Sequence, residues 1–134
     1  MARILGIDFG TKRTGIAATD PLKIIVSPVI TLPTEKVLDF LVNYMKTEIV
    51  EGIVCGHPGE ENKETLSALE QFVHRIKTTF PDIPVFFQDE HLTSRKASDL
   101  IVRSGLRKKK RRDKSLIDKV SAVLILQEYL GHLN

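Results

Sequence analysis

The stretch that decides the fold lies near the start of the chain and reads Ile4-Leu5-Gly6-Ile7-Asp8-Phe9-Gly10-Thr11-Lys12-Arg13-Thr14-Gly15-Ile16-Ala17-Ala18-Thr19. Two short apolar runs flank a polar segment around Gly10, which predicts two strands joined by a turn. Because side chains alternate along a strand, Leu5 and Ile7 are expected on one face. Gly6 and Asp8 then fall on the other face, where Asp8 ends the strand and Gly6 leaves room for a substrate backbone.

The rest of the chain alternates between strand and helix patterns. We expect strands at Ile4–Asp8, Thr14–Thr19, Ile24–Leu32 (interrupted by Pro28), Ile49–Cys55 and Pro84–Gln88, and helices from Pro33-Thr34 onward, over Leu66–Phe80, over Thr93–Ser104 and from Ser115 onward. The last helix is apolar almost all round between Val120 and Leu130, so it should be buried on most sides. This order predicts an α/β fold, a mixed five-stranded sheet with helices on both faces, in one domain over residues 1–134.

Composition indicates an ordinary globular domain. Hydrophobic residues make up 42% of the 134 residues and charged residues 28%. No apolar run approaches the roughly 18 to 20 residues that span a bilayer, and the N-terminus shows no signal-peptide pattern. Cys55 is the single cysteine, so no internal disulfide forms, which favours a reducing compartment. We therefore expect a cytoplasmic protein with no membrane association.

Positive charge is concentrated in one short segment. Arg107 to Lys114 holds seven basic residues and one acid, although the net charge of the whole chain is only +3. Such a segment is typical of polyanion binding. A solvated loop or a solubility tail is the alternative, although a position between two helices argues against a tail. The expected nucleic-acid contacts are Lys12, Arg13, Arg107, Lys108, Lys109, Lys110, Arg111 and Arg112.

Acidic residues occur on three separate elements, and each has a purely structural explanation. Asp8 can simply start a turn. Asp89 and Glu90 end a strand, and since neighbouring strand residues point to opposite faces, only one of them can face Asp8. Asp118 follows Ser115 by three residues, as an acid in a capping box does.

The surrounding motifs make the combination specific. Gly6 to Ala17 resembles the first motif of the YqgF family, also called the RuvX-like candidate Holliday junction resolvases. Asp89-Glu90-His91-Leu92-Thr93-Ser94 resembles that family's Asp-Glu-Arg-Leu-Thr-Thr segment. The basic run Arg107 to Arg112, then Asp118-Lys119, then Ala122 to Gln127, is similar to its closing motif. The resemblance covers nearly the whole chain, with the motifs in family order.

The resemblance implies a ribonuclease H-like fold and a metal-dependent nuclease. Family members are described as processing the 5′ end of the 16S ribosomal RNA precursor, or as candidate junction resolvases. By position, Asp8, Glu90 and Asp118 match the family's acidic triad. The chain departs from the family at His57, where the family has Leu, and at His91, where it has Arg. His57, His91, Asp89 and Thr11 are possible accessory residues. The two histidines could touch phosphate or assist proton transfer, or else each is simply a surface histidine.

The chemistry fits a pair of Mg²⁺ or Mn²⁺ ions about 3.5 to 4 Å apart. Such hard ions bind carboxylate oxygens, so Asp8 would bridge both ions, while Glu90 and Asp118 would each complete one. In the usual sheet order Glu90 would lie two strands from Asp8, roughly 9 to 10 Å away at the backbone. A long side chain and a two-ion cluster can bridge that gap.

Three alternatives remain open at the level of sequence. Asp8 to Thr11 followed by Gly15 also resembles the phosphate loop of sugar kinases and actin-like ATPases, which need two such domains. A non-catalytic nucleic-acid-binding module would keep the fold and the basic segment. Within the nuclease interpretation, RNA processing is favoured over junction resolution, which needs a dimer, because no leftover apolar stripe indicates a dimer interface. We expect structured RNA, or else branched DNA, as the partner of a monomer.

Overall fold

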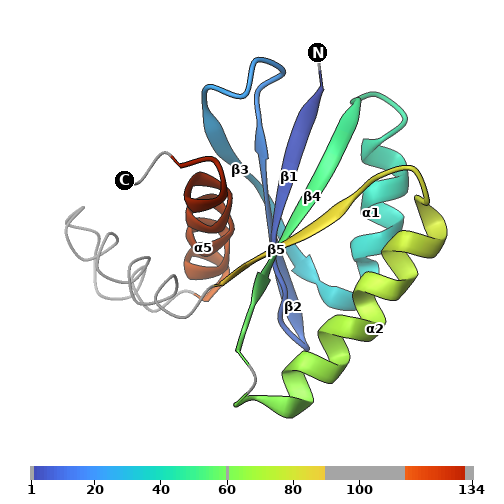
Figure 1. Ribbon diagram of the computed structural model, residues 1–134, viewed down its shortest axis with the longest axis vertical. Coiled ribbons are helices and arrows are strands. Elements are labelled where there is room, and N and C mark those ends of the chain that lie inside the picture. The colour runs from blue at the N-terminus through green and yellow to red at the C-terminus, as the bar shows by residue number, and fades with distance from the viewer. Residues whose placement is uncertain (1, 60, 90–113, 132–134) are drawn as a thin grey trace.

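The computed structural model describes residues 2–59, 61–89 and 114–131, and for residues 114–119 it describes the backbone alone. The elements along the chain are β1 (Arg3–Asp8), β2 (Arg13–Thr19), β3 (Val26–Pro33), the 3₁₀ turn η1 (Thr34–Lys36), α1 (Val37–Tyr44), β4 (Val50–His57), α2 (Lys63–Thr79), β5 (Val85–Asp89) and α5 (Lys114–Tyr129) (Figure 1). The helix expected over Thr93–Ser104 lies outside the described residues. None of the described helices is long and apolar enough to cross a membrane.

The five strands form one mixed sheet in the order β3-β2-β1-β4-β5. β2 runs antiparallel to both β1 and β3, whereas β4 is parallel to β1 and β5 is parallel to β4. The mixed five-stranded sheet expected from the sequence is therefore confirmed. Because β1, β4 and β5 are parallel, their carboxyl ends meet at one edge of the sheet.

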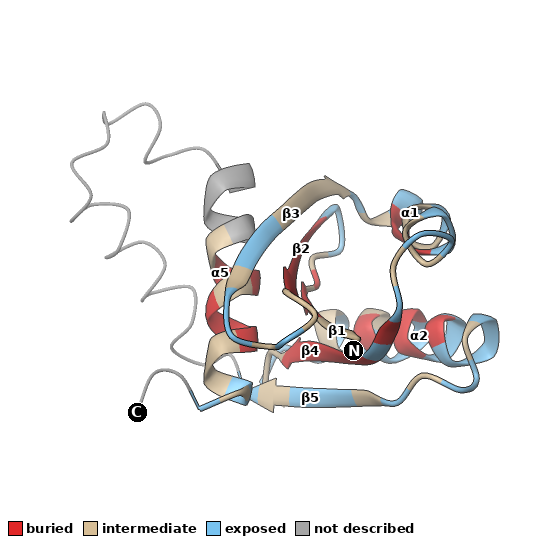
Figure 2. Cartoon of the chain, turned by 90° about the horizontal axis from the view of Figure 1, so that it is seen from above, coloured by how far each residue is buried: buried red, intermediate tan, exposed pale blue. Residues whose placement is uncertain are grey.

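Helices cover both faces of this sheet, as expected. Of the described helices, α1 and α2 lie on one face and α5 lies on the other (Figures 1 and 2). The larger apolar cluster, under α1 and α2, includes Leu5 and Ile7 of β1. The smaller cluster, under α5, is built from Val54, Ile125 and Leu126, with other apolar side chains at its margin. Alternation along β1 therefore separates the two faces as the sequence predicted.

The edge strand β3 begins later than its apolar pattern suggested. Ile24 and Ile25 lie in the β2–β3 loop because the carboxylate of Asp20 accepts hydrogen bonds from their backbone N–H groups, at 2.8 and 2.7 Å. Both isoleucines are exposed. Pro28 stays within β3, beside a register shift opposite Ile16 and Ala17, which an edge strand tolerates.

Two other boundaries differ from the sequence expectation. The helix expected from Thr34 starts as a 3₁₀ turn, and α1 proper begins at Val37, whose side chain is buried. β4 continues to His57, beyond the end that we expected at Cys55. α5 matches its expectation, since no residue from Val120 to Glu128 is fully exposed.

Candidate active site

The carboxyl edge of the sheet gathers several of the expected site residues. Asp8 ends β1, His57 ends β4 and Asp89 ends β5, with His57 and Asp89 paired across the two strands. The amino-terminal end of α5 lies at the same edge, beside the end of β5 (Figure 1). Asp8 is half-buried and has interactions within the protein.

The direction of α5 follows from its contacts with β1. Ile4, at the start of β1, packs in the cluster that contains Leu126 and Leu130. Gly6, further along β1, lies against Ala122. The helix therefore runs opposite to β1, and its first turns lie toward Asp8.

Gly6 is in close contact with α5. A Cβ atom on Gly6 would lie 2.9 Å from the carbonyl oxygen of Ala122 and 2.9 Å from Cβ of Leu126. The space that we expected Gly6 to leave for a substrate backbone is therefore occupied by the helix. Ser121 and Ala122, which are 1% and 0% exposed, allow this approach because they are small.

Asp118 is the fifth residue of α5, since the helix begins at Lys114. A capping box needs the acid at the third helical position, with Ser115 just outside the helix. The structure places Ser115 inside the helix, so the capping explanation for Asp118 is wrong. The side chain of Asp118 lies outside the described residues.

The turn after Asp8 is held by two threonine hydroxyl groups. Thr34 donates to the carbonyl oxygen of Gly10, and its hydroxyl lies 2.8 Å from that of the fully buried Thr14. The backbone N–H of Thr34 also donates to the carbonyl oxygen of Lys12, at 3.0 Å. Gly10 is required here, because a Cβ atom would lie 2.3 Å from the carbonyl oxygen of Arg13. Sequence reasoning missed the role of both threonines: Thr14 was noted only as part of the first motif and Thr34 only as the start of a helix.

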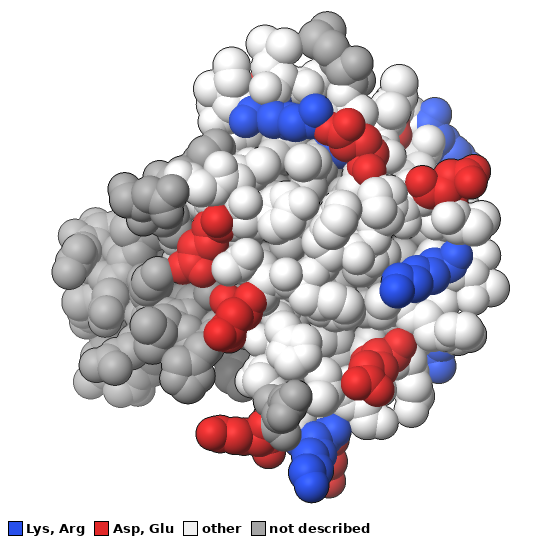
Figure 3. All heavy atoms as spheres, in the orientation of Figure 1, with Lys and Arg blue, Asp and Glu red and all other residues white. Residues whose placement is uncertain are grey.

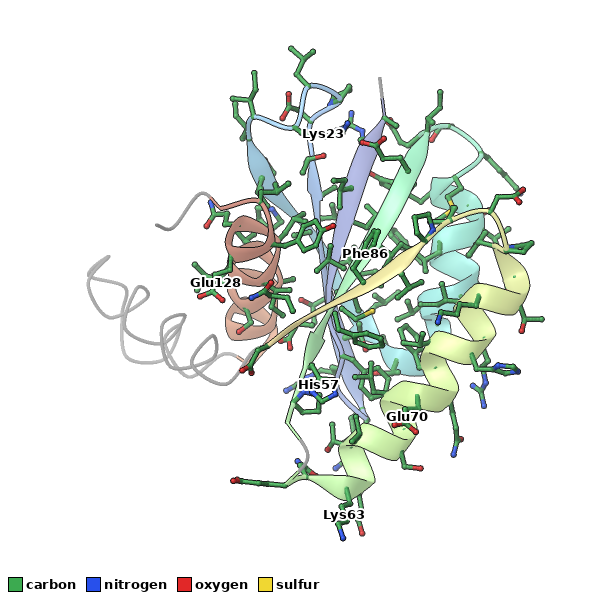
Figure 4. All side chains as sticks on the ribbon, viewed as in Figure 1. Lys23, His57, Lys63, Glu70, Phe86 and Glu128 are labelled. Carbon is green, nitrogen blue, oxygen red and sulfur yellow. The ribbon has the colours of Figure 1, made fainter. Side chains whose placement is uncertain are left out.

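His57 lies at the edge of the sheet but faces away from Asp8. Its Nδ1 accepts a hydrogen bond of 3.0 Å from the backbone N–H of Gly59, so the neutral ring carries its proton on Nε2. The ring makes an edge contact with Phe87, with centroids 5.8 Å apart (Figure 4 shows His57). Since Cys55 belongs to the cluster under α2, alternation places His57 on that face, opposite to the α5 face of Asp8.

Asp89 shares the face of His57. Phe87, two residues earlier in β5 and so on the same face as Asp89, pairs with Cys55, which lies under α2. Asp89 therefore also falls on the α2 side of β5. The sheet order also places β5 two strands from β1, as expected. Glu90 and His91 lie outside the described residues.

The expected nucleic-acid contacts are only partly described. Thr11 and Lys12, in the β1–β2 turn, are exposed, and so is Arg13 at the start of β2. Among the described residues, Figure 3 shows the Lys and Arg side chains of the visible face lying apart from one another. Arg107 to Arg112 lie outside the described residues.

Over residues 2–59, 61–89 and 114–131, no three His, Cys, Asp or Glu side chains come together as a metal site. Of the three expected ligands, only Asp8 has a described side chain. The hydroxyl of Ser121, three residues after Asp118, has no hydrogen-bond partner in the described part of the chain.

Comparison with known proteins decides the family. A family model described as "RuvX: Holliday junction resolvase" matches residues 2–132. The chain belongs to the RuvX family. A protein of Porphyromonas gingivalis named "Putative pre-16S rRNA nuclease" is 49% identical over 135 residues, which cover 98% of each chain. A protein of Flavobacterium johnsoniae with the same name is 45% identical over 134 residues, covering 98% of this chain and 97% of the relative. The expected family is thereby confirmed.

Solved structures similar to the RuvX chain confirm its ribonuclease H-like fold. RuvC of T. thermophilus in complex with a Holliday junction substrate aligns with a TM-score of 0.59 and 16% identity, covering 98% of this chain and 97% of RuvC. The Fowlpox virus resolvase in complex with Holliday junction DNA aligns with a TM-score of 0.61 and 15% identity, covering 98% of both chains. At these identities the likeness supports the fold alone.

The names of the family and of its members also identify the class of enzyme. A junction resolvase and a ribosomal RNA nuclease both cleave phosphodiester bonds in nucleic acid, so the RuvX protein is a phosphodiester-cleaving hydrolase. This confirms the enzyme class expected from the sequence. It also excludes the kinase-like and the non-catalytic alternatives.

Proposed function

We propose that this RuvX protein is a metal-dependent nuclease that processes the 5′ end of the 16S ribosomal RNA precursor, with Asp8, Glu90 and Asp118 as its metal ligands. The observation that carries the proposal is the contact between Gly6 and Ala122. It brings the helix that contains Asp118 against the strand that ends at Asp8. Two acids far apart in the sequence therefore belong to elements that touch.

The helical position of Asp118 supports its role. Position 118 shares one stripe of α5 with Ser121, Ala122 and Ile125, at spacings of three, four and seven residues. These three residues are at most 1% exposed. Position 118 therefore belongs to the sheet-facing stripe, and it lies toward the end of β1 that Asp8 occupies.

The choice of Glu90 over Asp89 rests on strand alternation. Asp89 falls on the α2 side of the sheet, whereas Asp8 falls on the α5 side. This arrangement disfavours Asp89 as a partner of Asp8 and leaves Glu90 as the acid that we assign to the metal site. Asp89 and His57 then act as accessory residues on the far side of the edge.

The donors fit a hard divalent cation. Asp8 is a half-buried carboxylate, and all three proposed ligands offer oxygen atoms, which Mg²⁺ and Mn²⁺ prefer. Two such ions, when bound, would supply a nucleophilic water and stabilise the leaving oxygen. Asp8, Glu90 and Asp118 would hold them, while Lys12, Arg13 and the segment from Arg107 to Arg112 would bind substrate phosphates.

Ribosomal RNA is the favoured substrate because the similar proteins of Porphyromonas gingivalis and Flavobacterium johnsoniae carry that name. We further propose a single domain that acts in the cytoplasm as a monomer, because cleavage of one RNA strand needs only one active site. The second candidate is a four-way DNA junction, which the family description favours. Junction resolution would need two active sites and hence a dimer.

A parallel cleavage assay separates the two substrates. The full chain is incubated with an RNA that carries the 5′ leader of the 16S precursor and, separately, with a four-way DNA junction, each in Mg²⁺, in Mn²⁺ and in EDTA. We expect metal-dependent cleavage of the RNA within the leader. Cleavage of the junction alone, in symmetric pairs, would replace RNA processing by junction resolution, and equal activity in EDTA would refute the metal site.

A further inference from the structure

A cavity of about 240 Å³ lies on the α1 and α2 side of the sheet edge, and apart from Thr11 its lining residues have no role expected from the sequence. Its walls are the β1–β2 turn, η1 with the start of α1, and the middle of α2. Thr11, in the turn, lines its mouth. The cavity is thus built on the same turn that follows Asp8.

The floor of the cavity is apolar and aromatic. Phe9 and Phe72 pack with their ring centroids 5.0 Å apart and tilted by 42°, and they are 8% and 5% exposed. Leu38 and Ala68 complete the apolar lining. A flat apolar ring is the kind of group that such a floor accepts.

The rim of the cavity is polar. Gln71 and Arg75, on successive turns of α2, line it from one side, and Glu35 lines it from the other. All three residues are exposed. An amide, a guanidinium and a carboxylate together offer donors and acceptors of the kind that pair with the edges of nucleobases.

The size of the cavity limits its ligand. Pockets for drug-sized molecules span about 300 to 1,000 Å³, so this one takes a single ring system rather than a larger ligand. Unstacked bases of single-stranded RNA are bound in this way, by aromatic contact with hydrogen bonds to the base edge. An unstacked base is therefore the ligand class that the lining matches.

The cavity lies close to Asp8 but on the opposite face of the sheet. Phe9 follows Asp8 directly, but Phe9 belongs to the cluster under α2, whereas Asp8 falls on the α5 face. A nucleic-acid strand that crosses the sheet edge past Asp8 would reach the cavity on the other side. Lys12, exposed in that turn, and Arg13, exposed at the start of β2, would lie near that path.

We propose that this cavity binds one unstacked nucleobase next to the scissile phosphodiester and so gives the nuclease a preference for single-stranded RNA at that position. The proposal rests on the proposed function, because it places the substrate strand across the edge that Asp8 occupies.

The first test is binding of nucleoside monophosphates to the full chain, followed by backbone amide chemical shifts. We expect saturable shifts at Thr11, Ala68 and Gln71 with at least one of AMP, GMP, CMP and UMP. Ala68→Leu fills the cavity and should abolish these shifts, whereas Ser67→Leu, at the exposed neighbouring position, should leave them unchanged. Shifts that do not saturate, or that survive in Ala68→Leu, would overturn the proposal whether or not the protein cleaves RNA.

The second test is cleavage of leader RNAs in which one base at a time is replaced by an abasic nucleotide. Removal of one base next to the cleaved bond should slow wild-type cleavage at least about tenfold. Arg75→Ala and Ala68→Leu should lose that dependence at the same position, and Lys77→Ala, which removes a charge on the same helix away from the cavity, should keep it. Cleavage that is insensitive to every abasic position would overturn the base site and leave the nuclease intact. If no substrate is cleaved at all, the proposed function fails, and the binding experiment still decides the cavity.

Discussion

The carbonyl oxygen of Ala122 lies 2.9 Å from the point where a Cβ atom on Gly6 would stand. This contact fixes the distance between α5 and β1. Since β1 ends at Asp8 and α5 contains Asp118, it also fixes how the backbones that carry these two acids lie relative to each other. The larger apolar cluster lies on the other face of the sheet, and α5 packs on its own face through the smaller cluster, which contains Val54, Ile125 and Leu126. The small residues at this contact therefore help to position the candidate active site and also contribute to the stability of the fold.

Gly6→Ala should destabilise the protein by about 1 to 3 kcal/mol, because the added methyl group overlaps a backbone oxygen and α5 must shift. Cleavage should fall with it, since α5 contains Asp118. Gly52→Ala is the matched control: its Cβ would meet Phe86 at 3.6 Å, an ordinary contact, so it should be neutral or stabilise by up to about 1 kcal/mol. Urea denaturation of both variants measures the difference, and an equally stable Gly6→Ala would refute the close contact.

Asp118→Asn should abolish turnover with little change in melting temperature, because Asp118 is the fifth residue of α5 and lies beyond the capping positions. A capping role would instead cost about 0.5 to 2 kcal/mol and spare activity. Single-turnover cleavage and thermal unfolding of the same preparation separate the two outcomes. A destabilised but fully active variant would show that Asp118 stabilises the fold and is not a metal ligand.

The β2–β3 loop should give stability a pH dependence through Asp20. Hydrogen bonds from the backbone N–H groups of Ile25, Ile24 and Leu22 lower the pKa of Asp20 below its ordinary 3.8. A carboxylate whose pKa is lowered on folding stabilises the protein above its unfolded pKa, and this contribution is lost as the pH falls through the folded pKa. The melting temperature of the wild type should therefore drop more steeply below pH ~4 than that of Asp20→Asn, whose amide does not titrate. Parallel curves in that range would contradict this role for the loop carboxylate.

The basic segment should dominate the salt dependence of binding. If Arg107 to Arg112 make about four or five phosphate contacts, the log–log salt slope is about −3 on single strands and −4 on duplex. Replacing Lys108, Lys109, Lys110 and Arg111 by serine should flatten that slope by about three units for all sequences alike. Single-turnover cleavage at saturating enzyme should survive, because these residues do not bind the ions. An unchanged slope in binding titrations would show that the segment does not contact the substrate.

Much of the fold could be predicted because its signals are local. The alternation of Leu5 and Ile7 against Gly6 and Asp8 identified the two faces of β1, and the apolar run after Val120 identified a buried helix. The predicted element boundaries were wrong where a side chain takes the backbone hydrogen bonds that would otherwise extend a strand. Asp20 captures the N–H groups of Ile24 and Ile25 and so delays β3 until Val26.

The candidate site was harder to predict because it depends on contacts between distant residues. The sequence marks Gly6 as small, but only the packing of α5 shows that a helix, rather than a substrate, lies against it. The hydrogen bond from Thr34 to Gly10 joins residues 24 positions apart, and no local pattern indicates it. Asp8 and Asp118 were singled out through their motifs, and their roles stay predictions.

The central claim is that Asp8 holds the catalytic metal ions, and single-turnover cleavage of the leader RNA by Asp8→Asn tests it most directly. The control is Asp82→Asn, because Asp82 is an exposed acid in the α2–β5 connection. The amide keeps the shape of the side chain but cannot bridge two cations, so the rate should fall on the order of a thousandfold or more, while folding and RNA affinity stay nearly unchanged. Asp82→Asn should cleave at the wild-type rate. If Asp8→Asn retains more than about a tenth of wild-type activity, Asp8 does not bridge the metal ions and the assignment of the site is wrong.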